Sequence, residues 1–180
     1  LLTDIGIYMI SISINQAIPF LMLPILTIYL APKDYGYVSN FSAILIIFIS
    51  IVGGGLGANI LKNYYIKDEV YMKKLMGNLY FLLFCSTSIV FTVAICLCFL
   101  LDIELIPEKL FMFVPWIALF CVSFEFNRIT LRIKKKALSY ALVTLSEVVL
   151  NISLSLILVI GLYFQWRGRV YGIMISHIVL

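Results

Sequence analysis

Charged residues are scarce in this chain of 180 residues, and three long stretches contain none. Asp, Glu, Lys and Arg make up 12% of the sequence, whereas apolar residues make up 63%. The uncharged stretches cover residues 5–32, 35–61 and 75–101, and each is 27 or 28 residues long. A helix needs about 20 residues to cross the hydrocarbon core of a bilayer. No soluble domain of this size buries so much apolar surface, so a membrane protein is predicted.

Residues that carry catalysis or hold metals are also few. The one histidine, His177, has no recognisable motif around it, and the four cysteines fall inside apolar stretches. Asp102 and Glu104 lie in a short loop, where solvated carboxylates are expected. The glycine run at residues 53–57 lacks the Lys-Ser/Thr that follows a phosphate-binding loop. We therefore expect no metal, no cofactor and no enzymatic activity.

The apolar stretches predict an all-α polytopic membrane protein with five full transmembrane helices and a sixth that is cut short. Short connections between the spans predict antiparallel helical hairpins within a single unit, residues 1–180. Only 11 residues follow Arg169, and the sequence does not begin with Met, so we expect a fragment. The predicted spans are residues 5–30, 36–61, 75–101, 110–131, 138–164 and the incomplete 170–180.

The net charge of +4 is distributed unevenly between the two sides of the predicted membrane. Nine basic residues lie on one side and four on the other. By the positive-inside rule, the side with nine basic residues is predicted to be cytoplasmic, and the N-terminus lies on that side. Because these charges sit where topology requires them, nucleic-acid binding is not expected. The nine are Lys62, Lys67, Lys73, Lys74, Arg128, Arg132 and Lys134–Lys136, and the four are Lys33, Lys109, Arg167 and Arg169.

Polar residues in the fifth span recur at helical spacing. Tyr140, Thr144, Glu147, Asn151 and Ser155 step by four, three, four and four positions, so they line one face of a helix. Glu147 is 11 residues past Lys136, roughly 16 Å along the helix axis and near the midplane. A carboxylate at that depth faces protein or water rather than lipid. A buried hydrogen-bond network and a substrate or ion pathway are both consistent with this face.

The first span contains two amides and two prolines. Asn15 lies near mid-depth next to Gln16, and Pro19 cannot donate a hydrogen bond to the carbonyl of Asn15. Pro24 likewise leaves the carbonyl of Phe20 without its helical partner. One interpretation is a kink that fits neighbouring helices, and the other is a flexible helix that lines a cavity and moves during transport.

Two opposite charges stand three residues apart near the cytoplasmic end of the fourth span. Glu125 and Arg128 can pair on one face of the helix. The pair is consistent with a structural salt bridge, and also with an inner gate or a contact for an anionic head group.

Several of these landmarks together resemble the polysaccharide-biosynthesis flippases of bacteria. These proteins translocate O-antigen and capsule repeat units and belong to the multidrug/oligosaccharidyl-lipid/polysaccharide exporter superfamily. The resemblance covers most of the chain and is carried by three landmarks. The first is residues 18–36, with their prolines and Asp34-Tyr35-Gly36. The others are residues 55–59 with the Tyr64-Tyr65 that follow, and Trp166-Arg167-Gly168-Arg169.

The resemblance implies two six-helix lobes around a central cavity, worked by alternating access, with this chain as the N-terminal lobe. It implies translocation of an undecaprenyl-pyrophosphate-linked oligosaccharide across the bacterial cytoplasmic membrane. The expected partners are this substrate, membrane lipids, a coupling cation, and the polysaccharide polymerase and chain-length machinery. A deep basic residue for the pyrophosphate is absent from the first five spans. The cavity candidates are Asn15, Gln16, Glu125, Arg128, Glu147 and Asn151.

Two alternatives remain beside the flippase. A cation-coupled multidrug exporter of the same superfamily would use Glu147 to bind its coupling ion. A membrane enzyme of the polysaccharide pathway would need a large outer loop with catalytic groups, and the predicted outer loops are short.

Overall fold

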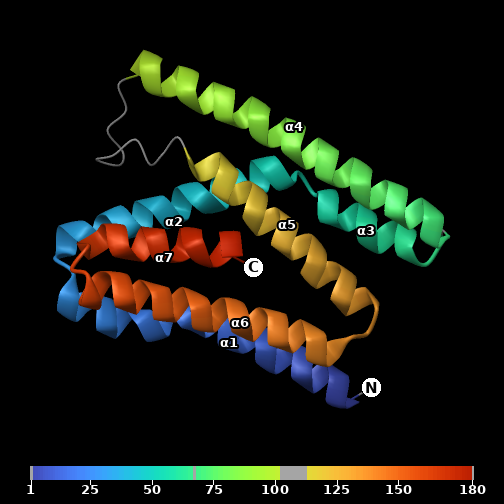
Figure 1. The fold of residues 1–180 in the computed structure, drawn as a ribbon, viewed down its shortest axis with the longest axis horizontal. Coiled ribbons are helices and arrows are strands. Elements are labelled where there is room, and N and C mark those ends of the chain that lie inside the picture. Colours follow the sequence, from blue (N-terminus) through green and yellow to red (C-terminus); the bar gives the residue numbers. More distant parts are fainter. Residues whose placement is uncertain (1, 67, 102–112, 180) are drawn as a thin grey trace. The chain divides into compact units, whose positions relative to one another are not determined.

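The computed structural model describes residues 2–66, 68–101 and 113–179, and this part of the chain is helical without strands (Figure 1). The apolar composition explains this, because a helix satisfies every backbone hydrogen bond within one segment. The elements are α1 (Leu2–Tyr29), α2 (Pro32–Gly53), α3 (Leu56–Tyr64), α4 (Glu69–Leu101), α5 (Val114–Ile133), α6 (Ala137–Leu156), the π-helix η2 (Ile157–Gly161) and α7 (Gln165–Val179).

Five helical segments in the described residues are long and apolar enough to cross a membrane. The described residues confirm the all-α class, and the length and composition of these segments agree with the five full spans expected from the sequence. Asp102, Glu104 and Lys109, together with the predicted start of the fourth span at residues 110–112, lie outside the described residues, as does Lys67. The five segments are Asp4–Tyr29, Pro32–Gly53, Glu69–Cys96, Val114–Ile133 and Ala137–Gly161.

The second predicted span is shorter in the structure than in the sequence prediction. Helix α2 ends at Gly53 instead of continuing to residue 61, and the separate helix α3 follows. Gly54 and Gly55 have φ values of 45° and 72°, a left-handed conformation that side chains disfavour. The glycine run therefore makes a turn, and residues 56–64 form an element of their own.

Helix α1 continues through both of its prolines. It is one α-helix from Leu2 to Tyr29, so neither proline ends the helix. Near Pro24, the Thr27 hydroxyl donates a hydrogen bond of 2.9 Å to the Pro24 carbonyl oxygen.

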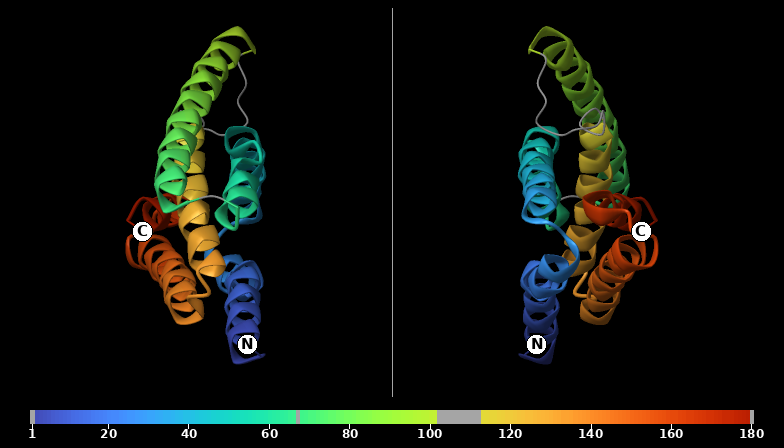
Figure 2. Two further views of the ribbon diagram at one scale, coloured as in Figure 1. Left: turned by 90° about the vertical axis from the view of Figure 1, so that its right-hand side faces the viewer. Right: turned by 90° about the vertical axis from the view of Figure 1, so that its left-hand side faces the viewer.

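The chain divides into two compact units. The first comprises residues 1–39 and 134–180, and within it α6 contacts α1, η2 and α7. Figures 1 and 2 show α1 and α6 running side by side, with α7 folded back along α6. This unit holds most of the polar residues singled out above.

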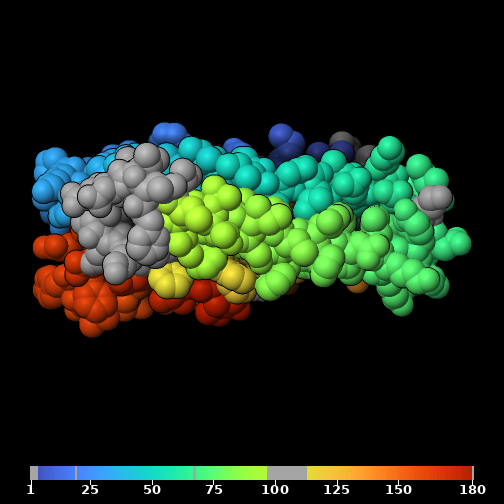
Figure 3. Space-filling model, turned by 90° about the horizontal axis from the view of Figure 1, so that it is seen from above, coloured from blue at the N-terminus to red at the C-terminus, as the bar shows by residue number. Residues whose placement is uncertain are grey.

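The second unit comprises residues 40–133, and within it α5 contacts both α3 and α4. Tyr80 of α4 meets Phe126 of α5 edge to face, with ring centroids 5.6 Å apart. Gly57 of α3 comes close to the side chain of Ile129 on α5. Much of α4 lies open at the surface in Figure 3, and its Phe81 is 67% exposed. Exposed apolar side chains of this kind are expected on a helix that faces lipid.

Candidate functional site

The α6 polar face consists of Tyr140, Thr144, Glu147, Asn151 and Ser155, and all five are buried. Their spacing places them on one side of the helix, toward α1 and α7, which are the long helices that contact α6. The predicted inward orientation of this face is therefore confirmed. A membrane helix turns polar side chains toward other helices because lipid cannot hydrogen-bond to them.

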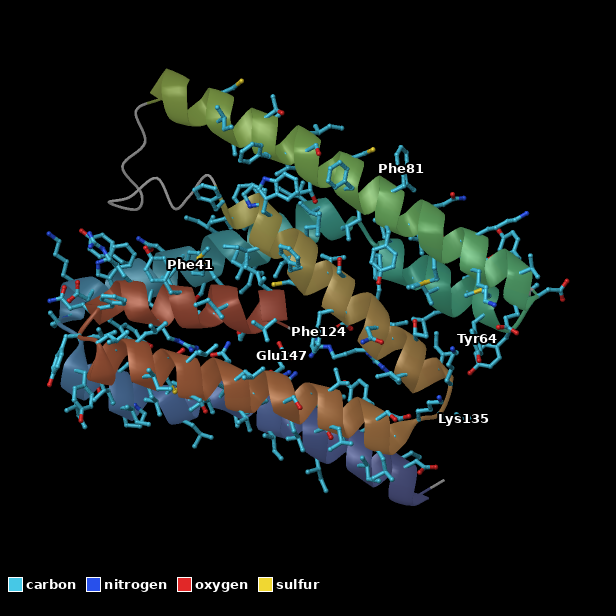
Figure 4. The ribbon with its side chains drawn as sticks, viewed as in Figure 1. Phe41, Tyr64, Phe81, Phe124, Lys135 and Glu147 are labelled. Atoms are coloured by element: carbon cyan, nitrogen blue, oxygen red, sulfur yellow. The ribbon has the colours of Figure 1, made fainter. Side chains whose placement is uncertain are left out.

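Glu147 lies at the centre of this face and receives contacts from two other helices. It is 8% exposed and points toward α7 in Figure 4. The Asn15 amide nitrogen of α1 donates to Oε2 over 3.4 Å, and Nε2 of His177 on α7 is 3.2 Å from Oε1. The structure thus brings together Asn15 and Glu147, which are 132 residues apart in the chain.

Arg169 of α7 packs against the next part of the α6 polar face, beside Asn151 and Ser155. Its Nη1 donates to Asn151 Oδ1 over 2.5 Å and to Ser155 Oγ over 2.6 Å. The residue is 8% exposed, and among the described residues it forms no ion pair with a carboxylate. Two short bonds from a guanidinium to neutral acceptors hold Asn151 and Ser155 in one geometry.

Ser176 and His177 connect these two groups of contacts. The Asn151 amide donates to Ser176 Oγ over 3.4 Å, and Ser176 Oγ donates to the Ile173 carbonyl over 2.9 Å. His177 Nδ1 lies 3.3 Å from Ser176 Oγ. We call the connected set the buried polar network, although Asn15 and His177 are only partly buried, and its members are Asn15, Glu147, Asn151, Ser155, Arg169, Ser176 and His177.

Two glycines allow α7 to approach α6 closely enough for these contacts. A Cβ on Gly168 would lie 2.8–2.9 Å from backbone atoms of Leu158 and Val159. A Cβ on Gly172 would lie 2.9 Å from backbone atoms of Ser155. Small residues four apart are typical of tightly packed membrane helices. The approach places the first two turns of α7 against the C-terminal part of the α6 polar face.

The other end of the α6 polar face packs differently. The rings of Tyr140 and Tyr8 of α1 meet edge to face at 5.1 Å. Thr144 is 1% exposed, and its hydroxyl has no hydrogen-bond partner among the described residues. A buried hydroxyl without a partner is costly in a protein interior. This position therefore offers a hydrogen-bonding group to a ligand or a water molecule.

Three predicted site residues do not join the buried polar network. Gln16 lies on the exposed side of α1. Glu125 and Arg128 belong to α5, in the second unit, where Arg128 Nη2 lies 2.5 Å from Glu125 Oε2. The predicted pairing of these two residues is confirmed. Arg132 lies 3.5 Å from the other carboxylate oxygen, and the Arg128 guanidinium lies over the Phe124 ring at 5.1 Å.

Four residues of the network were not predicted as site residues, namely Ser155, Arg169, Ser176 and His177, and the two that carry charge are the most consequential. His177 was set aside because no motif surrounds it, and Arg169 was counted as a loop charge. The spacing Gly168-x-x-x-Gly172 is the signal that could have identified both, because it predicts a close approach of α7. That approach brings Arg169, which lies between the glycines, and His177, five residues beyond Gly172, onto α6.

The network combines one carboxylate, one imidazole, one guanidinium, two amides and two hydroxyls. Such a set can hydrogen-bond to sugar hydroxyls and to anionic groups, and its ionisable pair can exchange protons. Among the described residues there is no cluster of three or more His, Cys, Asp or Glu side chains that could hold a metal ion. No family model, no curated protein and no solved structure matches the chain.

Proposed function

We propose that this protein is a flippase of the bacterial cytoplasmic membrane that moves a lipid-linked oligosaccharide from the inner to the outer leaflet. One observation carries the proposal, the buried polar network that joins the long apolar helices α1 and α6 to α7. Polar residues at membrane depth are costly and mark the path of a polar substrate. The sequence resemblance described above supports the same function.

In this proposal the chain supplies one six-helix lobe of a two-lobe transporter that works by alternating access, with its N-terminus in the cytoplasm. The amides and hydroxyls of the network would contact the sugars of an undecaprenyl-pyrophosphate-linked repeat unit. Arg169 is the buried cation of the network, and a guanidinium is suited to the phosphate oxygens of such a substrate. The pathway's polymerase and chain-length machinery would be functional partners.

A Glu147→Gln substitution tests the proposal in cells that depend on this protein for surface polysaccharide. Glutamine keeps the size of the side chain and removes its charge, which weakens the contact with His177. We expect surface polysaccharide to fall about tenfold, since the loss of one hydrogen bond to a charged group is about 1.5 kcal/mol or more. The abundance of the protein in the membrane should stay the same.

Ser146→Ala is the matched control, because Ser146 is the neighbouring residue and lies on the exposed side of α6. It should leave surface polysaccharide unchanged. Normal polysaccharide in the Glu147→Gln strain would remove Glu147 from the transport path.

The second candidate function is a cation-coupled multidrug exporter. The observation in its favour is the ionisable pair of Glu147 and His177, which could bind a coupling ion. A deletion strain that becomes sensitive to drugs while keeping its surface polysaccharide would favour the exporter over the flippase.

A further inference from the structure

Both ring nitrogens of His177 face oxygen atoms. Nδ1 lies 2.9 Å from the carbonyl oxygen of Ile173, and Nε2 lies 3.2 Å from Oε1 of Glu147. A carbonyl oxygen can only accept a hydrogen bond, so the contact with Ile173 requires a proton on Nδ1. The state of Nε2 then depends on where the proton between His177 and Glu147 resides.

Two arrangements satisfy both contacts. In one, the imidazole is doubly protonated and Nε2 donates to a Glu147 carboxylate. In the other, the imidazole is neutral with its proton on Nδ1, and a protonated Glu147 donates to Nε2. The two arrangements contain the same number of protons and carry no net charge.

The pair with one proton fewer cannot keep both contacts. It consists of a neutral imidazole and a carboxylate, with a single ring proton available for two oxygen acceptors. Whichever nitrogen loses the proton then turns a lone pair toward the oxygen beside it. The pair also acquires a net negative charge, which is unfavourable at membrane depth.

The helices packed against the pair present few titratable or charged groups. From α1, Asn15 donates to the other Glu147 oxygen. From α7, Arg169 lies one turn further along α6 and bonds to Asn151 and Ser155 instead of Glu147. On the other side, Tyr140 packs against Tyr8. The remaining titratable or charged groups on α1 and α7 are Asp4, Tyr29, Arg167 and Tyr171.

We propose that Glu147 and His177 together form a binding site for a single proton, and that its release loosens the contact of α7 with α6. The nitrogen of His177 already faces one of the carboxylate oxygens, which suits a proton better than a hard metal cation that needs a shell of oxygen ligands. The use of this proton to drive transport rests on the proposed function, whereas proton binding itself does not.

Solid-state NMR of the protein in lipid bilayers tests the site directly. The chain contains one histidine, so labelling with ¹⁵N-histidine reports on His177 alone, and ¹³C-glutamate labelling adds the Glu147 carboxyl group. Over a titration from about pH 5 to about pH 9, we expect the imidazole and the Glu147 carboxyl signals to change together in one transition.

In Glu147→Gln, the proton concentration at the midpoint of the imidazole transition should change by about tenfold or more. The reason is that the partner of His177 is then a side chain that does not ionise. Ser146→Ala should leave the transition in place. If Glu147→Gln does not fold, His177→Gln provides the same comparison through the Glu147 carboxyl signal. Sodium chloride added at constant pH and ionic strength should have no effect on either signal.

Three results would overturn the proposal. His177 could stay in one neutral tautomer at every pH, its transition could be the same in Glu147→Gln, or sodium could displace the Glu147 signal at constant pH. The NMR result is also independent of transport. A coupled transition together with normal polysaccharide in Glu147→Gln cells would contradict the proposed function and leave the proton site standing.

Discussion

At the scale of single residues, Arg169 is the least expected feature of the protein. A buried guanidinium is costly unless its donors are satisfied, and here its acceptors are the neutral Asn151 and Ser155. The arrangement keeps a full positive charge next to the α6 polar face without neutralising it. Arg169 therefore both fixes the geometry of Asn151 and sets the electrostatic potential of the network.

Removal of the Arg169 side chain should destabilise the protein. Arg169→Ala leaves Asn151 and Ser155 without their charged donor, and hydrogen bonds to a charged group contribute about 2 kcal/mol. We expect the thermal unfolding midpoint in detergent to fall by roughly 4–8 °C for a chain of this size. Arg167→Ala is the control, because Arg167 is exposed and two residues away, and it should change the midpoint by no more than about 2 °C. Equal midpoints for the two variants would show that the Arg169 contacts do not stabilise the fold.

At the scale of helices, the close packing of α6 and α7 assembles the site. Gly168 and Gly172 bring the backbone of α7 against Leu158, Val159 and Ser155. The π-helix η2 lies where this contact begins, and π-helical turns in other proteins often occur at functional sites. A change in the distance between the two helices would therefore act on Arg169 and His177 together.

Gly172→Ala should separate the helices. The added Cβ would meet backbone atoms of Ser155 at 2.9 Å, and backbone cannot give way as a flexible side chain can. Overpacking of this kind costs about 1–3 kcal/mol. Gly77→Ala on α4 is the matched control, since a Cβ there meets nothing within 4 Å and alanine favours helix. Thermal unfolding should show a lower midpoint for Gly172→Ala only, and a midpoint equal to that of Gly77→Ala would contradict the packing.

The sequence predicted some of these elements well and others poorly, for physical reasons. The α6 polar face could be predicted because helical periodicity alone decides which side chains share a side of a helix. Asn15 and Glu147 were predicted only as candidates for one cavity, because their direct contact depends on how α1 packs against α6. His177 and Arg169 were missed because their roles depend on a tertiary contact between α6 and α7. The end of α2 was misplaced because apolar residues continue through the glycine turn into α3.

At the scale of the whole molecule, the charge distribution predicts a topology that is still to be tested. The positive-inside rule places the turn at Lys33 outside and the basic turn at Lys134–Lys136 in the cytoplasm. Lys135 has a φ of 54° and lies in the turn before α6.

Cysteine labelling of intact cells tests this orientation. In a variant with the four native cysteines replaced, Lys33→Cys should react with a membrane-impermeant maleimide in intact cells. Lys135→Cys should react only after the cells are permeabilised. Both residues are exposed, so the two sites form a matched pair. The reverse pattern would mean that the N-terminus is outside.

The central claim is that the buried polar network lies on the path of a lipid-linked oligosaccharide. Its most direct test uses proteoliposomes that contain the protein. The measured quantity is the rate at which an undecaprenyl-pyrophosphate-linked oligosaccharide moves from one leaflet of the proteoliposome membrane to the other. We predict translocation with the wild-type protein and with Ser146→Ala, and a rate lower by about tenfold with Glu147→Gln. Equal rates for all three proteins, or no translocation above protein-free liposomes, would contradict the account.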